Sequence, residues 1–413
     1  MIHDTRTFEP ETFAAGTAET TGTRETASTR ETARTRETAS TQVTAGIPKT
    51  AGIPETTATI ASVGSAFPPA SYSQDEVGEL LGLRNRVVRK LLGAPHIRRR
   101  HLYLPPADPA TGRIPPESPA DLHAKFRAGA LEIGVPAIEQ ALRGAALDPA
   151  DVDHLVCVTS TGFLVPGLSS LFARELGLSR RLLRSDIVGM GCNAGLNGMN
   201  PLVQWARTHP GRVGLLVCCE INSAMYVVDD TPRTGIVNSL FGDGAAAAVV
   251  TTGAGRGPAT GPRPRVLDFE SFSIPEQWAA MRFDWAAEAG KWSFFLDPEI
   301  PYVIGFNVRE PVTRLLARNG LDQRAVQHWV FHTGGGAVID SIKLSLGLEE
   351  HDVRHTRSVL RDFGNISSGS FLVSLQRLLA EGSAAPGEYG VLVTMGPGAQ
   401  IETALIQFGP AAP

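Results

Sequence analysis

Three residues of this 413-residue chain have side chains that together suit acyl-transfer chemistry: Cys192, His332 and Asn365. A cysteine can be the nucleophile, a histidine can exchange the proton of that cysteine, and an amide can donate a hydrogen bond to an oxyanion on the acyl carbonyl. Glycines flank the histidine and the asparagine in HTGGG and FGNISSGS, which lets the backbone approach a ligand closely. The set therefore indicates a covalent acyl-transfer site.

Each of these residues also has a structural interpretation. Free cysteines are among the most buried residue types, a histidine at a strand end is often only a hydrogen-bonded structural residue, and an asparagine beside glycine is often a turn former. Papain-like proteases use the same three residue types. Their cysteine lies near the mature N-terminus in a Cys-Gly-Ser/Ala-Cys setting, whereas Cys192 lies mid-chain and precedes NAGLN. This context argues against a protease.

A strand-to-helix turn is expected to position Cys192. The segment SDIVGM, from Ser185, predicts a buried strand, and residues 193–208 predict a helix that HPG ends. Unpaired N–H groups and the helix dipole stabilise a thiolate at the first turn of a helix, so we expect a lowered pKa for Cys192. Pro201 lies inside this helix, and we expect it to kink the helix or to begin a second segment.

Internal similarity indicates a duplicated fold. The segment DVDHLVCVTSTG from Asp151 aligns without a gap with AVQHWVFHTGGG from Ala325, and a helical pattern follows each. GRVGLLVCCE and YGVLVTMGPG form a second, looser pair of strand patterns. Strand–turn–helix units in both halves predict a layered α/β architecture of two similar halves, with an active site at their junction.

Composition divides the chain into three parts. Residues 1–60 contain TRETAS, TRETAR and AGIP repeats and too little apolar surface to offset the entropy of ordering, which predicts a disordered tail. Residues 61–254 are expected to form the half with Cys192, and residues 265–410 the half with His332 and Asn365. GAGRGPATGPRPR, between them, is typical of a linker. Helices are expected after Ser73, as N-cap, and over residues 122–142.

Charge and cysteine content restrict the partners and the compartment. A net charge of −4 without a basic stripe argues against nucleic acid and anionic membranes as partners. No apolar run approaches the roughly 18 residues of a membrane span. Four cysteines do not form a disulfide framework in a chain of this length, so we expect the cytoplasm.

A cationic segment offers a site for a polyanion. RNRVVRKLLGAPHIRRR includes Arg89 and Lys90 within about one helix and a loop. This pattern fits either a solvated helix face or the mouth of a site for a ligand such as coenzyme A.

Five motifs together resemble those of the type III polyketide synthases, the chalcone synthase group of thiolase-fold condensing enzymes. They are GMGCNAG, LFGDGAAA, the histidine before its glycines, GNISSGS and MGPG, in the family's order over about residues 63–408. The resemblance implies a thiolase-like α/β fold, a homodimer, and decarboxylative condensation of malonyl-CoA or other acyl-CoA substrates without a metal or other cofactor. It also implies that Cys192 carries the growing chain as a thioester, while His332 and Asn365 bind the thioester carbonyl and stabilise the enolate.

Further motifs are similar to those of bacterial synthases that make 3,5-dihydroxyphenylacetyl-CoA for antibiotic biosynthesis: SYSQ, TSTGFLVPGLS, RSDIVGMGCNAGLN, FFLDP and HDVRHT. This similarity implies four condensed malonyl units and helper enzymes of the same pathway. Aligned with the family, Tyr226 falls at the gatekeeper phenylalanine and is expected to contact substrate, although a structural role is equally open, and Arg89 and Lys90 fall near the cations that bind coenzyme A. The alternatives are a synthase of the resorcinol or tetrahydroxynaphthalene type and a non-catalytic acyl-CoA-binding subunit.

Overall fold

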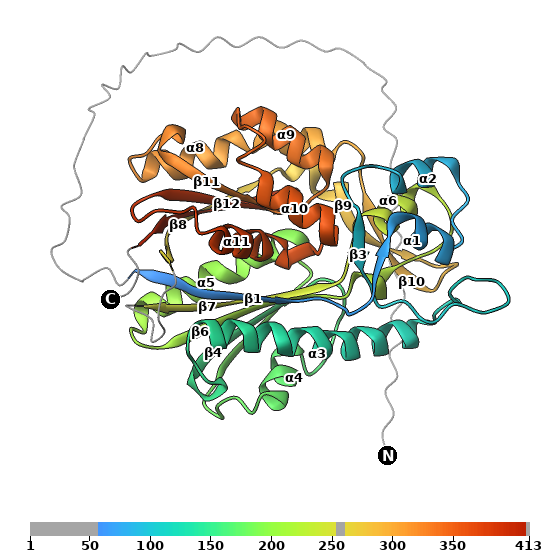
Figure 1. Ribbon diagram of the computed structural model, residues 1–413, viewed down its shortest axis with the longest axis horizontal. Coiled ribbons are helices and arrows are strands. Elements are labelled where there is room, and N and C mark those ends of the chain that lie inside the picture. Colours follow the sequence, from blue (N-terminus) through green and yellow to red (C-terminus); the bar gives the residue numbers. More distant parts are fainter. Residues whose placement is uncertain (1–56, 253–260, 410–413) are drawn as a thin grey trace, which may run out of the picture. The chain divides into compact units, whose positions relative to one another are not determined.

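The computed structural model describes residues 57–252 and 261–409 of the chain (Figure 1). The predicted disordered tail, through residue 56, and most of the predicted linker, residues 253–260, lie outside the described residues. Strand β1 (Ala58–Ala66) includes three residues that composition assigned to the tail. The predicted tail boundary at residue 60 is therefore too late, because Ala58 and Ile60 are already buried in the sheet.

The main sheet has nine strands in the order β11–β12–β13–β8–β1–β7–β6–β4–β5 within the described residues. The first half comprises β1, β4 (Val152–Thr159), β5 (Leu183–Val188), β6 (Val213–Glu220) and β7 (Gly244–Thr252). The second half comprises β8 (Pro264–Ser273), β11 (Val326–Phe331), β12 (Tyr389–Gly396) and β13 (Gln400–Phe408). Among the described residues, a short antiparallel pairing of Ala58 with Val266 and Thr59 with Arg265 is the only one that joins the halves within the sheet.

Both halves repeat one pairing pattern. β4 and β6 are parallel, and β7 is antiparallel to both β6 and β1. In the second half β11 and β12 are parallel, and β13 is antiparallel to both β12 and β8. The segments that align in the sequence fall on β4 and β11, and the looser pair falls on β6 and β12. The predicted duplicated α/β fold is thereby confirmed.

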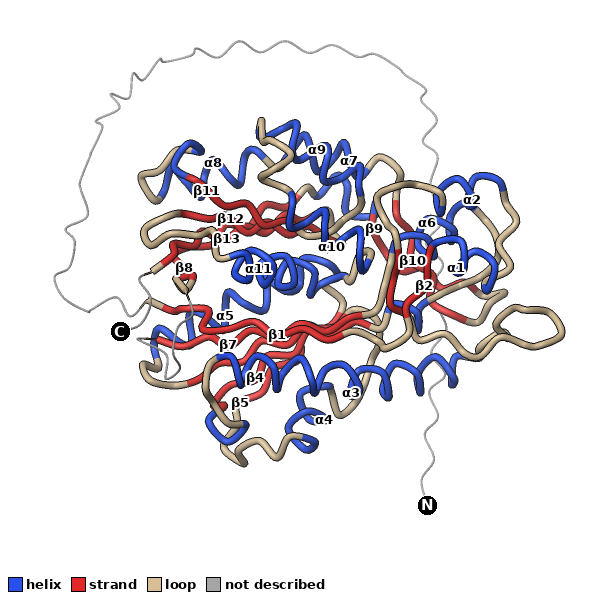
Figure 2. Tube along the Cα trace, viewed as in Figure 1, coloured by secondary structure: helices blue, strands red, loops and turns tan. Residues whose placement is uncertain are grey.

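Helices cover the outer faces of the two halves and fill the space between them (Figures 1 and 2). Helix α3 (Pro119–Gly144) and α4 (Leu168–Glu175) lie against the first half, while α8 (Arg309–Arg318) and α9 (Gly336–Leu346) lie on the far side of the second. Helices α5 (Ala194–Thr208) and α11 (Ser370–Glu381) lie between the halves. Both are apolar on most sides, as a helix packed between two sheets must be.

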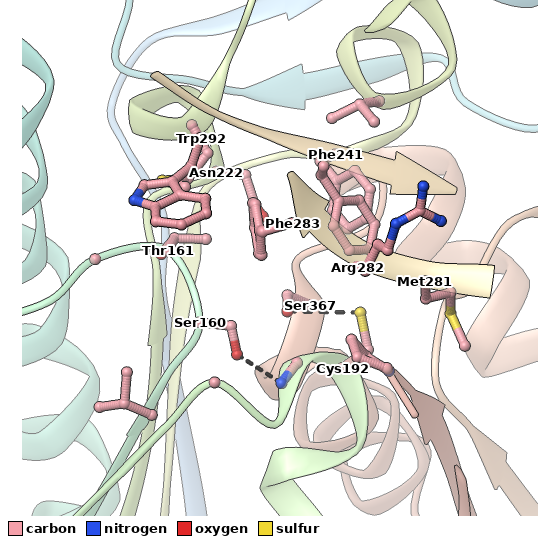
Figure 3. A pocket seen from close by; sticks show the side chains of 18 of the residues that line it. Ser160, Thr161, Cys192, Asn222, Phe241, Met281, Arg282, Phe283, Trp292 and Ser367 are labelled. Carbon is pink, nitrogen blue, oxygen red and sulfur yellow. Dashed lines mark hydrogen bonds between the residues drawn. The ribbon is translucent and has the colours of Figure 1, made fainter. Parts of the chain in front are cut away.

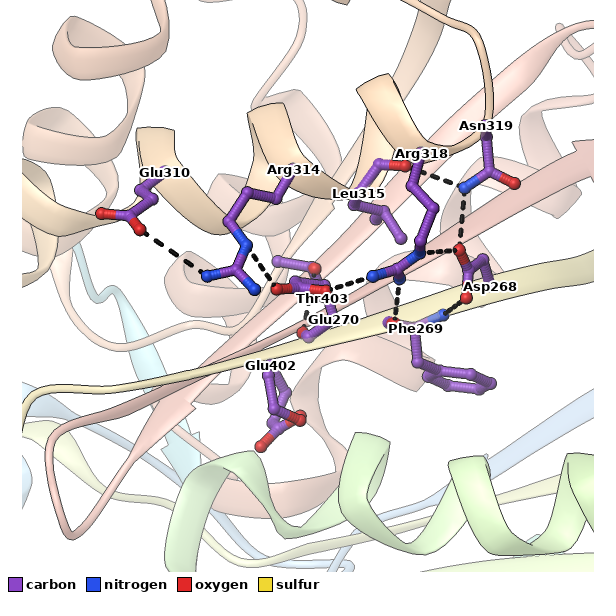
Figure 4. Close-up of polar contacts among 11 residues, drawn as sticks. Asp268, Phe269, Glu270, Glu310, Arg314, Leu315, Arg318, Asn319, Glu402 and Thr403 are labelled. Carbon is purple, nitrogen blue, oxygen red and sulfur yellow. Dashed lines mark hydrogen bonds and ion pairs between the residues drawn. The ribbon is translucent and has the colours of Figure 1, made fainter. Parts of the chain in front are cut away.

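Ion pairs fix α8 on strand β8 (Figure 4). Arg318 contacts Asp268 through Nε at 2.7 Å and Glu270 through Nη1 at 2.5 Å. Arg314 Nε adds a contact of 2.9 Å to Glu270. Glu270 is largely buried, whereas both arginines are partly exposed. These contacts therefore attach α8 to the outer face of β8 and cover the Glu270 carboxylate.

Smaller elements surround the end of the sheet at which Cys192 lies. They are β2 (Ser71–Ser73), α1 (Gln74–Leu80), α2 (Arg86–Leu92), β3 (Arg99–His101), α6 (Pro232–Leu240), β9 (Met281–Ala286), β10 (Lys291–Leu296), α7 (Ile300–Asn307) and α10 (Arg354–Phe363).

The predicted helices are confirmed, with one correction. Ser73 caps α1 in a capping box: its Oγ accepts from the N–H of Glu76, whose carboxylate accepts from the N–H of Ser73. Helix α3 covers the predicted residues 122–142. Helix α5 runs as one helix from Ala194 to Thr208 with Pro201 inside it. Of the two predicted alternatives, a second segment that begins at Pro201 is wrong, because the helix continues through this residue, and a kink at Pro201 stays a prediction.

Strand β5 differs from its prediction in burial. SDIVGM does form a strand, but β5 is the last strand of the sheet and pairs only with β4. Its side chains are exposed or half-buried, with Leu183 49% and Val188 47% exposed. The apolar pattern predicted a core strand, and the edge position of β5 makes that prediction wrong for this chain taken alone.

Candidate active site

The turn after β5 places Cys192 as the sequence predicts. A short 3-10 turn, Gly191–Asn193, connects β5 to α5. Gly191 has a φ of +70°, and a Cβ there would lie 2.3 Å from the ring of Pro397, so no other residue fits without displacement. The N–H of Gly191 donates to Ser160 Oγ at 2.8 Å. The backbone beside the Cys192 sulfur is therefore held from two sides, by Ser160 after β4 and by Pro397 of the second half.

The second half supplies the histidine and the asparagine. His332 follows β11, where its N–H donates to the carbonyl of Val393 at 2.9 Å and its Nδ1 shares a 2.5 Å hydrogen bond with Ser370 Oγ. Asn365 follows α10, and its N–H donates to the carbonyl of Leu240 at 2.9 Å. Both side chains are 2% exposed.

Ser367 brings the three predicted residues together. Cys192 Sγ donates to Ser367 Oγ at 3.6 Å (Figure 3), and the Ser367 N–H donates to Asn365 Oδ1 at 2.8 Å. The Asn365 side chain also acts to lower the pKa of the Cys192 thiol, and the backbone of Ser367 acts to raise the pKa of His332, so both side chains lie close to the Cys192–Ser367 contact. Sequence reasoning gave no role to Ser367 or Ser370, although both lie in or beside the quoted motif GNISSGS.

Burial decides the protonation of the pair. It raises the pKa of the Cys192 thiol to about 12, against the opposing hydrogen bonds from Ser367 and Asn365. It lowers the pKa of His332 to about 3. The predicted lowering of the Cys192 pKa is therefore wrong, because desolvation outweighs the helix terminus. A thiol beside a neutral imidazole is the favoured state of this site.

A cavity of about 670 Å³ opens at Cys192 (Figure 3). Its polar lining includes Ser160, Thr161, Asn222 and Ser367. Its aromatic lining includes Phe241 after α6 and residues of the β9–β10 hairpin: Phe283, Trp292 and Phe294. The strand alternation in MRFDWA and KWSFFL is the signal that would have indicated a hairpin with one face toward the site.

A smaller cavity of about 290 Å³ lies beside the glycine run that follows His332. Its lining joins Gly334 and Gly336 to Leu91, Ala94 and His96, at and beyond the end of α2. Arg89 and Lys90 lie exposed in the last turn of α2 and are not among the lining residues of either cavity. The structure therefore leaves both cations on the exposed side of α2 and does not bring them to Cys192.

Tyr226 lies behind the wall of the main cavity. It is 5% exposed, its hydroxyl donates to the carbonyl of Phe241 at 2.6 Å, and it is not among the lining residues, whereas Met225 and Phe241 are. The predicted direct contact of Tyr226 with substrate is not supported, because the chain leaves the 3-10 turn Asn222–Met225 with the methionine facing the cavity.

A buried carboxylate, Glu220, supports the polar side of the cavity. It is fully buried and accepts from the N–H of Ser160 at 2.9 Å, from Thr161 Oγ1 at 2.9 Å and from Ser368 Oγ at 2.6 Å. Burial raises the pKa of Glu220, against these hydrogen bonds. The sequence gave no signal for it, since its partners lie about 60 and 148 residues away in the chain.

Residues 57–252 and 261–409 contain no group of three or more His, Cys, Asp or Glu side chains placed to hold a metal ion. In the same residues, no helix is both long and apolar enough to cross a membrane.

A cysteine at a strand-to-helix turn of one half, facing a histidine and an asparagine from the other half of a duplicated sheet, defines a condensing enzyme of the thiolase-like fold. The family model for the N-terminal domain of chalcone and stilbene synthases matches residues 120–255, and the model for their C-terminal domain matches residues 275–409. The chain belongs to the chalcone and stilbene synthase family and is a type III polyketide synthase, as its motifs predict.

Curated relatives and a solved structure agree with this assignment. The chain is 52% identical to the 3,5-dihydroxyphenylacetyl-CoA synthase of Streptomyces toyocaensis over 84% of this chain and 90% of that protein. It is 51% identical to the synthase of the same name from Amycolatopsis balhimycina over 84% and 92%. The structure of 1,3,6,8-tetrahydroxynaphthalene synthase from Streptomyces coelicolor A3(2) matches with a TM-score of 0.77 and 26% identity, over 86% of this chain and 100% of that one.

Proposed function

We propose that this chain condenses malonyl-CoA units by decarboxylative Claisen steps on Cys192 and cyclises the product to 3,5-dihydroxyphenylacetyl-CoA, a precursor for antibiotic biosynthesis. The observation that carries the chemistry is the meeting of Cys192, His332 and Asn365 around Ser367 at the wall of a cavity. The product is supported by two relatives of that name that are more than half identical to the chain. The cavity of about 670 Å³ is within the usual range for small ligands, roughly 300–1,000 Å³.

Loading forms a thioester on Cys192. The sulfur attacks the thioester carbonyl of an acyl-CoA, the bond from that carbonyl to the coenzyme A sulfur breaks, and coenzyme A leaves as a thiol. The proton of Cys192 passes to the leaving sulfur through His332, whose neutral imidazole can accept a proton and return it. Ser370 holds the far nitrogen of this ring at 2.5 Å and so fixes its orientation.

Extension uses the amide of Asn365. A malonyl-CoA loses carbon dioxide, and the resulting enolate carries its negative charge on oxygen, where N–H donors from Asn365 and His332 stabilise it. Because Asn365 Oδ1 accepts from the N–H of Ser367, its NH₂ group is left to face the reaction. The enolate carbon then attacks the acyl carbonyl on Cys192, the carbon–sulfur bond breaks, and the lengthened chain leaves on coenzyme A to be loaded again.

We assign the entry of coenzyme A to the smaller cavity. It connects the end of α2 with Gly334 and Gly335, which follow His332 and place no side chain in the cavity, and this bare backbone suits a narrow pantetheine arm. Arg89 and Lys90, on α2, are then the cations that meet the phosphates. Tyr226, which does not line the cavity, would act on the site indirectly, through the carbonyl of Phe241 that it holds.

A homodimer is supported by the exposed edge of the first half. Leu183 and Val188 on β5 are about half exposed, and nearby Phe163 and Val165 are 71% and 83% exposed. A second copy pairing along β5 would cover this apolar edge. Phe163 and Val188 also line the main cavity, so the same contact would close its mouth. We further propose a cytoplasmic location, consistent with four free cysteines, and helper enzymes of the same pathway as partners.

The test is incubation of the pure protein with malonyl-CoA alone, followed by mass spectrometry of the products. The expected product is 3,5-dihydroxyphenylacetyl-CoA. A resorcinol or tetrahydroxynaphthalene product would show a different type III synthase. Absence of turnover, with no iodoacetamide-sensitive Cys192, would instead show a non-catalytic acyl-CoA-binding subunit.

A further inference from the structure

A fully buried arginine lies behind the wall of the active site. Arg100, in strand β3, has 0% of its surface exposed. Its Nε donates to Gln74 Oε1 at 2.8 Å, and its Nη1 donates to Tyr226 Oη at 2.9 Å and to the carbonyl of Phe241 at 2.7 Å. We call Gln74, Arg100, Tyr226 and the Phe241 carbonyl the Arg100 cluster.

This guanidinium is buried without a carboxylate among its hydrogen-bond partners. All three acceptors are neutral oxygens, and Nη2 has no hydrogen-bond partner among the described residues. Asp243 acts on Arg100 only as a nearby charge and is itself hydrogen-bonded to Ser223 and to the N–H of Tyr103. Burying a cation in this way costs stability. An apolar side chain of similar size would stabilise the fold more than this buried guanidinium does. The presence of an arginine therefore points to a function for its N–H donors.

The carbonyl of Phe241 is the group on which the Arg100 cluster converges. It accepts from Arg100 Nη1 and also from the Tyr226 hydroxyl at 2.6 Å. The ring of Phe241 lines the main cavity on the other side. The cluster is anchored to the chain before Phe241 as well, since Gln74 Nε2 donates to the carbonyl of Ser239 at 2.7 Å.

Phe241 and Asn365 belong to one junction. Their backbones form a parallel bridge: the N–H of Asn365 donates to the carbonyl of Leu240 at 2.9 Å, and the N–H of Gly242 donates to the carbonyl of Asn365 at 3.0 Å. Gly364, with a φ of +71°, passes so close to Arg100 that a Cβ there would lie 2.8 Å from Arg100 Cδ. The arginine side chain therefore touches both strands of the junction that carries Asn365.

We propose that Arg100, with Tyr226 as its hydroxyl link, is a positioning residue that sets the Phe241–Asn365 junction and thereby aims the Asn365 amide at the enolate. This inference rests on the proposed role of Asn365. Cys192 is held mainly by the first half, through Gly191 and Ser160, and its contact with Ser367 is its link to the Asn365 segment. The Arg100 cluster should therefore govern enolate formation and leave the nucleophile unchanged.

The sharpest test is Tyr226→Phe, which removes one hydroxyl and no carbon atom. We expect kcat for malonyl-CoA decarboxylation to fall about fivefold to tenfold, because catalysis declines steeply when a donor is misplaced. KM for malonyl-CoA, the melting temperature and the rate of Cys192 alkylation by iodoacetamide should stay at wild-type values. Tyr72→Phe is the matched control. Tyr72 lies opposite Arg100 in the β2–β3 pair but is outside the Arg100 cluster, so removing its hydroxyl should leave kcat unchanged.

Arg100→Met provides a second variant, in which all three hydrogen bonds and the charge are lost, and its decarboxylation should fall further than that of Tyr226→Phe. Should Arg100→Met not fold, Tyr226→Phe alone decides. Wild-type decarboxylation by Tyr226→Phe would overturn the inference, as would parallel losses of decarboxylation, alkylation and melting temperature, which mark a merely structural role. A wild-type protein that never decarboxylates malonyl-CoA would overturn the proposed function, and this inference with it.

Discussion

The two ends of the nine-stranded sheet are covered very differently. At one end β11 is buried at every position except Gln327, and α11 and α10 pack against it. At the other end β5 has no fully buried side chain. Both strands are apolar enough to read as core in the sequence. The difference shows that the second half is closed by its own helices, whereas the first half exposes an edge that a second copy of the chain is expected to cover.

The same asymmetry divides the chemistry. The first half has the extra strand β5, and the turn after it carries Cys192. The second half, in which β11 is the last strand, supplies His332 at the end of β11 and Asn365 after α10. The two halves are thus similar scaffolds, of which one positions the proposed nucleophile and the other the proposed hydrogen-bond donors. Their separate roles can be tested by changing each half alone.

The largest effect is expected from Cys192→Ala in the first half. This variant should form no product above the detection limit of mass spectrometry and should not be labelled by iodoacetamide at this position, because it lacks the sulfur that forms the proposed thioester. Cys157→Ala, a buried cysteine of β4, is the control and should keep its turnover. Product formation by Cys192→Ala would contradict the assigned nucleophile.

In the second half, Asn365→Asp should lower the decarboxylation rate by roughly 10²-fold to 10³-fold, the usual loss for one oxyanion donor. The substitution keeps an oxygen to accept from the Ser367 N–H and replaces the NH₂ donor by a second oxygen that repels the enolate. Alkylation of Cys192 should persist. If Asn365→Asp decarboxylates malonyl-CoA at the wild-type rate, the enolate is stabilised elsewhere.

The pH dependence of Cys192 alkylation shows whether Cys192 of the first half is a thiol or forms a thiolate–imidazolium pair with His332 of the second half. The thiolate is the reactive form, and the pKa of Cys192 is raised to about 12, so the rate should rise roughly tenfold per pH unit between about pH 7 and pH 9. His332, with a pKa lowered to about 3, stays neutral over this range and cannot hold the thiolate. A rate that is already constant from about pH 6 would reveal a thiolate–imidazolium pair between the halves.

The smallest expected effect concerns β5, the exposed edge of the first half: a substitution there should halve the mass of the assembly in solution. Leu183→Arg places a charge in the middle of the proposed contact and should convert the dimer into a monomer in sedimentation equilibrium. Leu344→Arg, on α9 and 83% exposed in this chain, is the matched control and should leave the mass unchanged. A wild-type monomer, or a dimer unaffected by Leu183→Arg, would show that β5 is not the interface.

Local patterns in the sequence predicted the features that depend on neighbouring residues. The N-cap at Ser73, the turn that carries Cys192 and the two aligned strand segments were all predicted, because each depends on a few consecutive residues or on a direct repeat. The family resemblance was confirmed for the same reason, since its motifs are short and ordered.

Features that depend on distant contacts were not predictable in this way. The burial of β5 is set by its place in the sheet, and the pKa of Cys192 is set by how deeply both halves enclose the sulfur. Ser367 lies 175 residues after Cys192 in the sequence, and only folding brings the two side chains within hydrogen-bond distance. Met225, for which the sequence predicted no role, faces the cavity in place of Tyr226, because the backbone turn at Asn222–Met225 decides which side chain points inward.

The covalent state of the enzyme during turnover tests the division between the halves most directly. Wild-type protein is quenched in acid while it consumes malonyl-CoA, digested, and its peptides are weighed by mass spectrometry. Acyl mass additions are predicted on the peptide with Cys192 and on none of those with Cys157, Cys218 or Cys219. Product formation with an acyl group on another residue, or with none on Cys192, would contradict the account.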